Sequence, residues 1–238
     1  MKNLHDEKEV LQEERSILTA PLQRRSFLQF AGAGAAGVAL IAAGCKKDRS
    51  MIDDGGIKGG VTLDFKDDIG VLNYAYALEQ LEAAFYIQVA ATPYANISAP
   101  ELAYFKDIQF HEIAHREFFK NALGPAAIGG LEVDFSKINF ADRTSVLGTA
   151  KAFEDLGVSA YNGAGKLLKS TVYLTLAGKI VSVEARHAAY IRELISPNSF
   201  SNVEVVDAVM GLDKSRDPKA VLAIAGGFVK TKINVINL

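Results

Sequence analysis

One acidic motif occurs twice in this chain, once in each half, and this repeat constrains the fold more than any other feature. The first copy is A-L-E-Q-L-E-A-A-F-Y, in which Glu79 precedes Tyr86 by seven residues. The second is A-F-E-D-L-G-V-S-A-Y, in which Glu154 precedes Tyr161 by seven residues. A Glu-x-x-His pair follows these glutamates after 33 and 30 residues; the pairs are Glu112 with His115 and Glu184 with His187. The duplication predicts two similar pairs of helices.

Four helices are predicted from the spacing of apolar residues and from capping residues. Their expected ranges are 65–91, 98–121, 143–169 and 171–195. Asp67 or Asp68 is the expected N-cap of the first, and a capping box with proline in the first turn begins at Ser98. The link over 124–143 is long, whereas the links on either side are short. This pattern predicts an all-α fold, a four-helix bundle with one long crossover.

The rest of the chain divides around this bundle. We expect four segments: a signal segment over 1–44, a flexible Gly-, Asp- and Lys-rich tether over 45–64, the bundle over 65–196 and a C-terminal helical extension over 197–238. Within the extension, a helix is predicted to begin at Asp217-Pro218. The pattern assigns no function to the extension.

The acidic and histidine residues of the repeat all lie on the stripe of their helix that should face the core. An ionised carboxylate in an apolar core is costly, so it protonates, forms an ion pair or binds metal. Four carboxylates balance two divalent ions, and carboxylates combined with imidazoles suit iron and manganese. We therefore expect two metal ions, iron or manganese, at a site made by Glu79, Glu112, His115, Glu154, Glu184 and His187.

Other interpretations apply to single residues. An isolated Glu-x-x-His is usually a surface pair, and an isolated buried histidine is usually a hydrogen-bonded core residue. It is the joint occurrence of two motifs on inward stripes that favours metal. His111 lies about 100° from the ligand stripe and is not expected to be a ligand.

Three further residues of the repeat region are candidates for a catalytic role. Tyr86 and Tyr161 lie two turns from the first glutamates and can hydrogen-bond the ligand carboxylates. Glu82 is either an alternative ligand or a neighbour of the ligands, and its ion-pair candidates are Arg116 and Arg186. The internal alignment places Glu82 opposite Gly157, which favours the second alternative. Glu82, Tyr86 and Tyr161 are thus the candidate proton donors.

At these residues the chain resembles the ferritin-like superfamily, and within it the exported, desiccation-related group. The resembling stretches are L-N-Y-A-Y-A-L-E-Q-L-E-A-A-F-Y, H-E-I-A-H-R-E-F-F, F-E-D-L-G-V-S-A-Y-N-G-A and V-E-A-R-H-A-A-Y-I-R. The resemblance implies the same six ligands. It also implies iron oxidation, peroxide scavenging, manganese-dependent peroxide dismutation or no activity, because members of the superfamily differ in this respect.

The N-terminal segment indicates export. Arg24 and Arg25 precede an uncharged Gly/Ala-rich run that ends in A-A-G-C at Cys45, followed by two lysines. The paired arginines and the weakly hydrophobic run resemble a twin-arginine signal. The A-A-G-C sequence resembles a lipoprotein cleavage box, which would lipidate Cys45 and attach the protein to a membrane. The alternatives are simple cleavage and an uncleaved anchor over 26–45, which is long enough to span a bilayer.

Composition narrows the remaining function classes. The net charge of −2 gives no electrostatic case for nucleic acid, and a single cysteine excludes an intrachain disulfide. We expect an exported periplasmic or cell-envelope protein that uses oxygen, peroxide or ferrous iron as its small-molecule partner in stress protection. The alternative is a metal-free or non-catalytic envelope scaffold, and an iron-storage cage ranks third. A homo-oligomer is compatible with the sequence.

Overall fold

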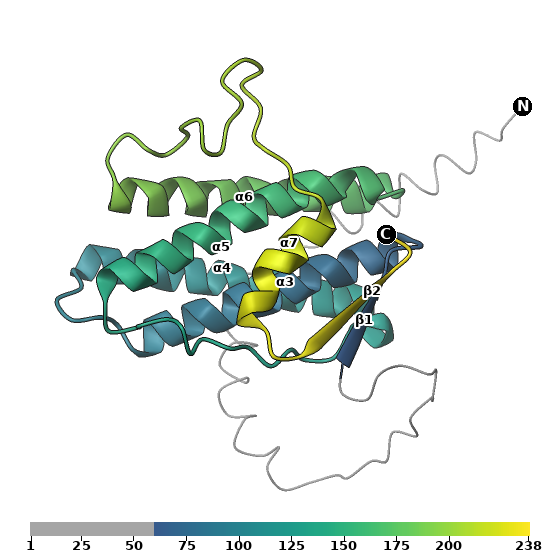
Figure 1. Cartoon of the computed structure of the whole chain (residues 1–238), viewed down its shortest axis with the longest axis horizontal. Helices are drawn as coiled ribbons and strands as arrows, with labels where there is room; N and C mark the ends of the chain where they lie inside the picture. Colours follow the sequence, from purple (N-terminus) through teal and green to yellow (C-terminus); the bar gives the residue numbers. More distant parts are fainter. Residues whose placement is uncertain (1–59) are drawn as a thin grey trace, which may run out of the picture. The chain divides into compact units, whose positions relative to one another are not determined.

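The computed structural model describes residues 60–238, and four long helices make up most of this part of the chain (Figure 1). The helices are α3 (Asp68–Ala91), α4 (Ala99–Leu123), α5 (Arg143–Ala164) and α6 (Thr171–Ile195). The expected all-α bundle is confirmed. The signal segment, with Arg24, Arg25 and Cys45, and most of the predicted tether lie outside the described residues.

Each of the four helices begins at a polar N-cap whose side chain accepts a backbone hydrogen bond. The caps are Asp67, Ser98, Asp142 and Ser170. The capping box at Ser98 is only half formed, because the carboxylate of Glu101 binds Arg143 at 3.0 Å rather than turning back to the cap. Helix α5 ends at Ala164, earlier than expected, because the 3₁₀ turn η3 (Gly165–Leu167) follows it.

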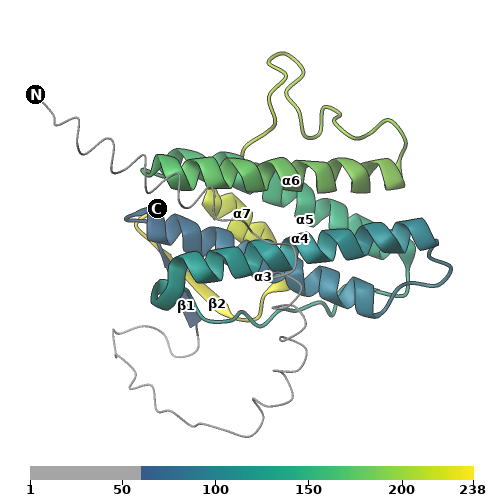
Figure 2. The ribbon, with the colours of Figure 1, turned by 180° about the vertical axis from the view of Figure 1, so that it is seen from behind.

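The helices pack as two hairpins, α3 with α4 and α5 with α6. Figure 2 shows α4 and α6 on the near side, with α3 and α5 behind them. The crossover between α4 and α5 includes the 3₁₀ turn η2 (Gly124–Ala126) and runs along α3. Asn73 and Gln80 hold it there, because each side chain bonds the crossover backbone in two places. The crossover also packs Phe135 and Phe140 against the buried Phe85.

The segment after α6 is more than the helical extension that the sequence predicts. Helix α7 (Pro218–Ala225) begins at the N-cap Asp217 as expected and packs on α5 (Figure 1). The 3₁₀ turn η4 (Gly226–Phe228) follows. Strand β2 (Lys232–Ile236) then pairs in parallel with β1 (Gly60–Asp64). The predicted tether is therefore wrong for residues 60–64, which form a strand with a fully buried Leu63.

Two features fix these added elements to the bundle. Gly70 allows the end of β1 to approach α3, because a Cβ at this position would lie 1.7 Å from the carbonyl oxygen of Asp64. Arg192 on α6 is 1 % exposed and bonds Asp155 on α5 at 2.6 Å. It also bonds Asn202 and Glu204 in the loop after α6 at 2.6 and 2.7 Å. In residues 60–238, no helix combines the length and apolar character needed to cross a membrane.

Candidate metal centre

The six residues expected as ligands come together in the middle of the bundle. Each of the four helices contributes at least one of them: Glu79 from α3, Glu112 and His115 from α4, Glu154 from α5, and Glu184 and His187 from α6. All four carboxylates are completely buried, and the side chain of His115 is 12 % exposed. The helical stripes thus place six polar side chains in the interior of one bundle.

One quartet of ligand atoms surrounds His115. Its Nδ1 atom lies 2.7 Å from Glu184 Oε1, 3.6 Å from Glu79 Oε2 and 3.7 Å from Glu112 Oε2. These four residues form a group whose ligand atoms all lie within 4.8 Å of one another. We name this set the His115 quartet.

A second quartet surrounds His187. Its Nδ1 atom lies 2.9 Å from Glu112 Oε1, 3.3 Å from Glu184 Oε2 and 3.4 Å from Glu154 Oε2. We name this set the His187 quartet. Glu112 and Glu184 belong to both quartets, and each directs a different carboxylate oxygen to each histidine. Two carboxylates therefore bridge the two quartets, whereas Glu79 and Glu154 each belong to one quartet.

These short distances are not accompanied by aligned hydrogen bonds. Eight buried atoms of the two quartets lack a hydrogen-bond partner: both imidazole Nδ1 atoms, both oxygens of each bridging carboxylate, and one oxygen of each of the other two. Buried polar groups without partners are rare and costly. Eight such atoms in two sets of four fit a site for metal ions. The bundle thus contains a buried carboxylate–histidine cluster capable of holding metal.

The two repeat tyrosines complete the cluster by crossing between the two halves. The hydroxyl of Tyr161 on α5 donates to Glu79 Oε1 on α3, and that of Tyr86 on α3 donates to Glu154 Oε1 on α5. Each non-bridging carboxylate therefore has one oxygen bound by a tyrosine and the other directed at a histidine. This reciprocal arrangement is the structural form of the sequence repeat.

The comparison with known families agrees with this geometry. The family model of the ferritin-like domain matches residues 67–197, which is more than half of the chain. The chain belongs to the ferritin-like family. The match covers all four helices and every residue of the two quartets. A search of curated proteins gives no match to the chain.

Burial and mutual repulsion shift the pKa values of the ionisable groups inside this ferritin-like domain. Burial raises the pKa of Glu79, of Glu112 and, to about 7, of Glu154. Burial acts in the same direction on Glu184, but the two nearby imidazoles outweigh it and lower its pKa to about 2. Burial also opposes charge on His115, yet the surrounding carboxylates raise its pKa to about 12. Metal binding would therefore release protons from the cluster.

Glu82 lies beside the cluster but belongs to neither quartet. It is 3 % exposed, its Oε2 atom has no hydrogen-bond partner, and burial raises its pKa well above the ordinary value. Its Oε1 atom lies 3.0 Å from where a Cβ at position 157 would be, so Gly157 makes room for this carboxyl group. The expected ion pair with Arg116 or Arg186 is absent from the described residues, and Arg116 binds Glu117 instead.

His111 contacts the cluster from outside. Its Nδ1 atom lies 2.9 Å from the outer nitrogen, Nε2, of His187. His111 is in neither quartet, in agreement with its position off the ligand stripe. The position of His111 on its helix does not predict this contact, because a side chain off the core face can still reach a neighbouring helix.

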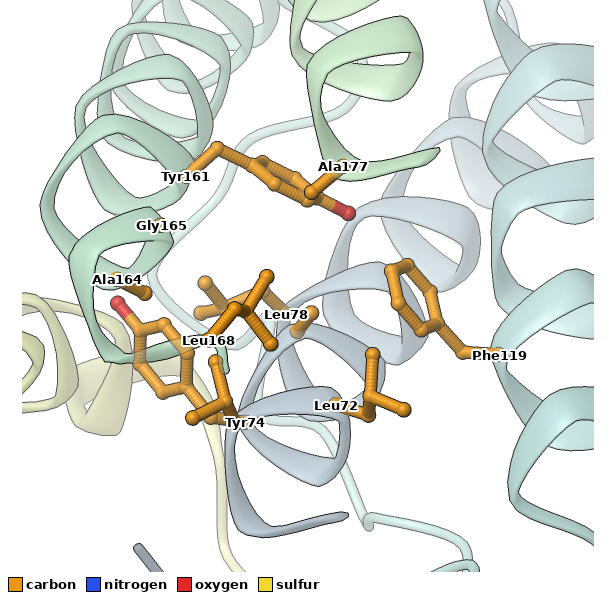
Figure 3. A pocket seen from close by; sticks show the side chains of 11 residues that line it. Leu72, Tyr74, Leu78, Phe119, Tyr161, Ala164, Gly165, Leu168 and Ala177 are labelled. Carbon is orange, nitrogen blue, oxygen red and sulfur yellow. The ribbon is translucent and has the colours of Figure 1, made fainter. Parts of the chain in front are cut away.

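A small, mostly apolar cavity is lined in part by Tyr161. It has a volume of about 20 Å³, enough for roughly one water-sized molecule. Figure 3 shows Tyr161 on one side of the cavity and Leu72, Leu78 and Phe119 around other parts of it. Tyr161 therefore contacts both this cavity and, through its hydroxyl group, Glu79 of the cluster.

Proposed function

We propose that this ferritin-like protein holds two divalent ions, iron or manganese, and uses them in oxygen or peroxide redox chemistry or in ferrous-iron oxidation. The division of eight unpartnered buried atoms into two quartets carries the proposal. The charges support two ions, because four carboxylates offset four positive charges. Mixed carboxylate and imidazole ligands suit iron and manganese better than copper or a purely structural zinc.

The protein's own residues would prepare this chemistry. Glu112 and Glu184 would bridge the ions, and Glu79 with His115 and Glu154 with His187 would complete the two quartets. A bound pair of ions supplies a place where one O–O unit can be held and reduced or oxidised.

The remaining candidate residues would position the ligand carboxylates and supply protons. Tyr86 and Tyr161 would hold Glu154 and Glu79 in position through their hydroxyl groups. Glu82 would store a proton beside the centre, because burial raises the pKa of its carboxyl group well above the ordinary value. The apolar cavity at Tyr161 favours a small uncharged oxidant over a hydrated cation as its occupant.

Elemental analysis tests the metal part of the proposal. We expect two equivalents of iron or manganese per chain in protein purified from its native compartment. Glu112→Gln should lower this content, because Glu112 belongs to both quartets. The surface variant Lys106→Ala is the control and should keep the wild-type metal content. Peroxide-consumption and ferrous-oxidation assays of the loaded protein then separate the reactions. A wild-type protein without metal would support the metal-free envelope scaffold.

The proposal also includes the cellular location of the protein. We propose that the protein is an exported envelope lipoprotein of the desiccation-related ferritin-like group, attached to a membrane through a lipid on Cys45. The support is the sequence from Arg24 and Arg25 to the A-A-G-C segment. Replacing both arginines by lysine should retain the precursor inside the cell, and normal export of this variant would exclude the twin-arginine route. Cys45→Ala should release the protein from membranes, and continued membrane association would exclude lipidation.

A further inference from the structure

The contact between His111 and His187 is an aligned hydrogen bond between two coplanar rings. The planes of the rings differ by 7° and their centroids are 5.1 Å apart. The 2.9 Å between His111 Nδ1 and His187 Nε2, added to the two ring radii, accounts for this separation. The rings therefore meet edge to edge in nearly one plane, and they are not stacked face to face.

The direction of this hydrogen bond follows from the rest of the cluster. His187 turns Nδ1 toward three carboxylates, so this is the nitrogen that a metal ion would use. The proton of the neutral imidazole then resides on Nε2 and is donated to His111 Nδ1. His111 is exposed, so its own Nε2–H can point to solvent. His111 thus fixes both the tautomer and the ring orientation of His187.

The other half of the centre has no equivalent of this contact. Among the residues that the structure describes, no hydrogen bond is made by Nε2 of His115. The internal repeat aligns Glu112 with Glu184, so the position equivalent to His111 is Val183. A valine side chain has no acceptor to offer. The two histidines of the centre therefore differ in how firmly they are held.

We propose that His111 makes the two metal sites unequal, so that the His187 quartet binds a divalent cation more tightly than the His115 quartet. His111 is a positioning residue, because it acts through His187 and touches no ligand atom of the quartets. Removing the hydrogen-bond partner of a histidine ligand typically weakens metal binding by about 10–100-fold. The inference rests on the proposed dimetal centre.

A titration of the metal-free, full-length protein with Mn²⁺ alone tests the inequality. Calorimetry should resolve two binding steps. Electron paramagnetic resonance should show an isolated Mn²⁺ signal after the first equivalent, which declines as the second site fills. Glu154→Gln should remove the tighter step, because Glu154 belongs only to the His187 quartet. Glu79→Gln should remove the weaker step, because Glu79 belongs only to the His115 quartet.

Two replacements of His111 separate the hydrogen bond from the bulk of the ring. His111→Phe keeps a flat ring without an acceptor and should weaken the tighter step by about 10–100-fold, so that the two steps merge. His111→Asn places an oxygen near the position of Nδ1 and should retain the wild-type steps. The control is Phe110→Ala on the exposed face of the same helix, which should change neither step.

Three results would overturn the inference. Two equal steps in the wild type would show that the sites do not differ. Unchanged steps in His111→Phe would show that the hydrogen bond has no effect on affinity. Loss of the tighter step in Glu79→Gln rather than in Glu154→Gln would place the tighter site in the other quartet. The failure of the wild type to bind any Mn²⁺ is a different outcome, because it would remove the proposed function itself.

Discussion

The neutral state of Glu82 should make the metal-free protein less stable at pH 7 than it would be without this carboxyl group. Burial raises the pKa of Glu82 well above its ordinary value of 4.5. A carboxyl group with a raised folded-state pKa favours the folded protein below its ordinary pKa. Above that pH it disfavours folding, because only the unfolded chain can release the proton. We therefore expect Glu82→Gln to stabilise the metal-free protein.

The size of the effect follows from the pH scale. One unit between the pH and the unfolded-state pKa corresponds to about 1.4 kcal/mol. Between pH 4.5 and pH 7 the cost of keeping Glu82 neutral reaches about 3 kcal/mol, and glutamine removes this cost. The extra amide N–H groups are themselves buried and cost about 1 kcal/mol or more. The net gain in the free energy of unfolding at pH 7 should be about 1–3 kcal/mol.

Urea unfolding of wild type and Glu82→Gln at pH 5 and pH 7, after metal removal, measures this gain. The cost of the amide groups cancels in the comparison between the two pH values. The advantage of the variant should therefore grow by about 2.5 kcal/mol from pH 5 to pH 7. An advantage that is the same at both values would refute the argument, because Glu82 would then be ionised in the folded state. Metal analysis adds a control: Glu82→Gln should keep both ions, whereas Glu79→Gln should lose one.

Three other predictions concern stability. Tyr161→Phe removes a hydrogen bond to a buried carboxylate, and we expect the free energy of unfolding to fall by about 1–3 kcal/mol in urea. Gly163→Ala places a Cβ 1.7 Å from a backbone oxygen and should cost about 1–3 kcal/mol, whereas Gly148→Ala on the same helix has open space and should be neutral or stabilising by thermal melting. Arg192→Met removes the buried guanidinium that binds Asp155, Asn202 and Glu204. Lys151 still pairs with both carboxylates, so the variant should cost about 1–3 kcal/mol. In limited proteolysis, this last variant should be cut faster within residues 198–216.

The sequence predicted those parts of the fold that depend on the helical period. A spacing of three or four residues determines which face a side chain shares, so Glu112 and His115 could be placed in the core from sequence alone. The cap at Ser98 was predictable for a similar reason, because its partner, the backbone N–H of Glu101, lies three residues away. Family membership and the buried cluster followed from the same local patterns.

The parts that sequence reasoning missed depend on contacts between distant segments. Strand β1 is only five residues long, and its partner β2 lies 172 positions further along the chain. No local pattern therefore indicates the pairing. The carboxylate of Glu101 leaves the capping box because Arg143, 42 residues later, lies within reach. His111 was placed correctly relative to the ligand stripe. Its contact with His187 depends on how closely α4 and α6 approach, and one helix at a time cannot give that distance.

The pairing of β1 with β2 has a consequence for when the domain can be completed. Strand β1 can pair only after β2, 172 residues further along the chain, has been synthesised, so β1 stays unpaired while the four long helices are made. Contacts between such distant segments also form slowly. The domain is therefore complete only once residues 232–236 are available for pairing.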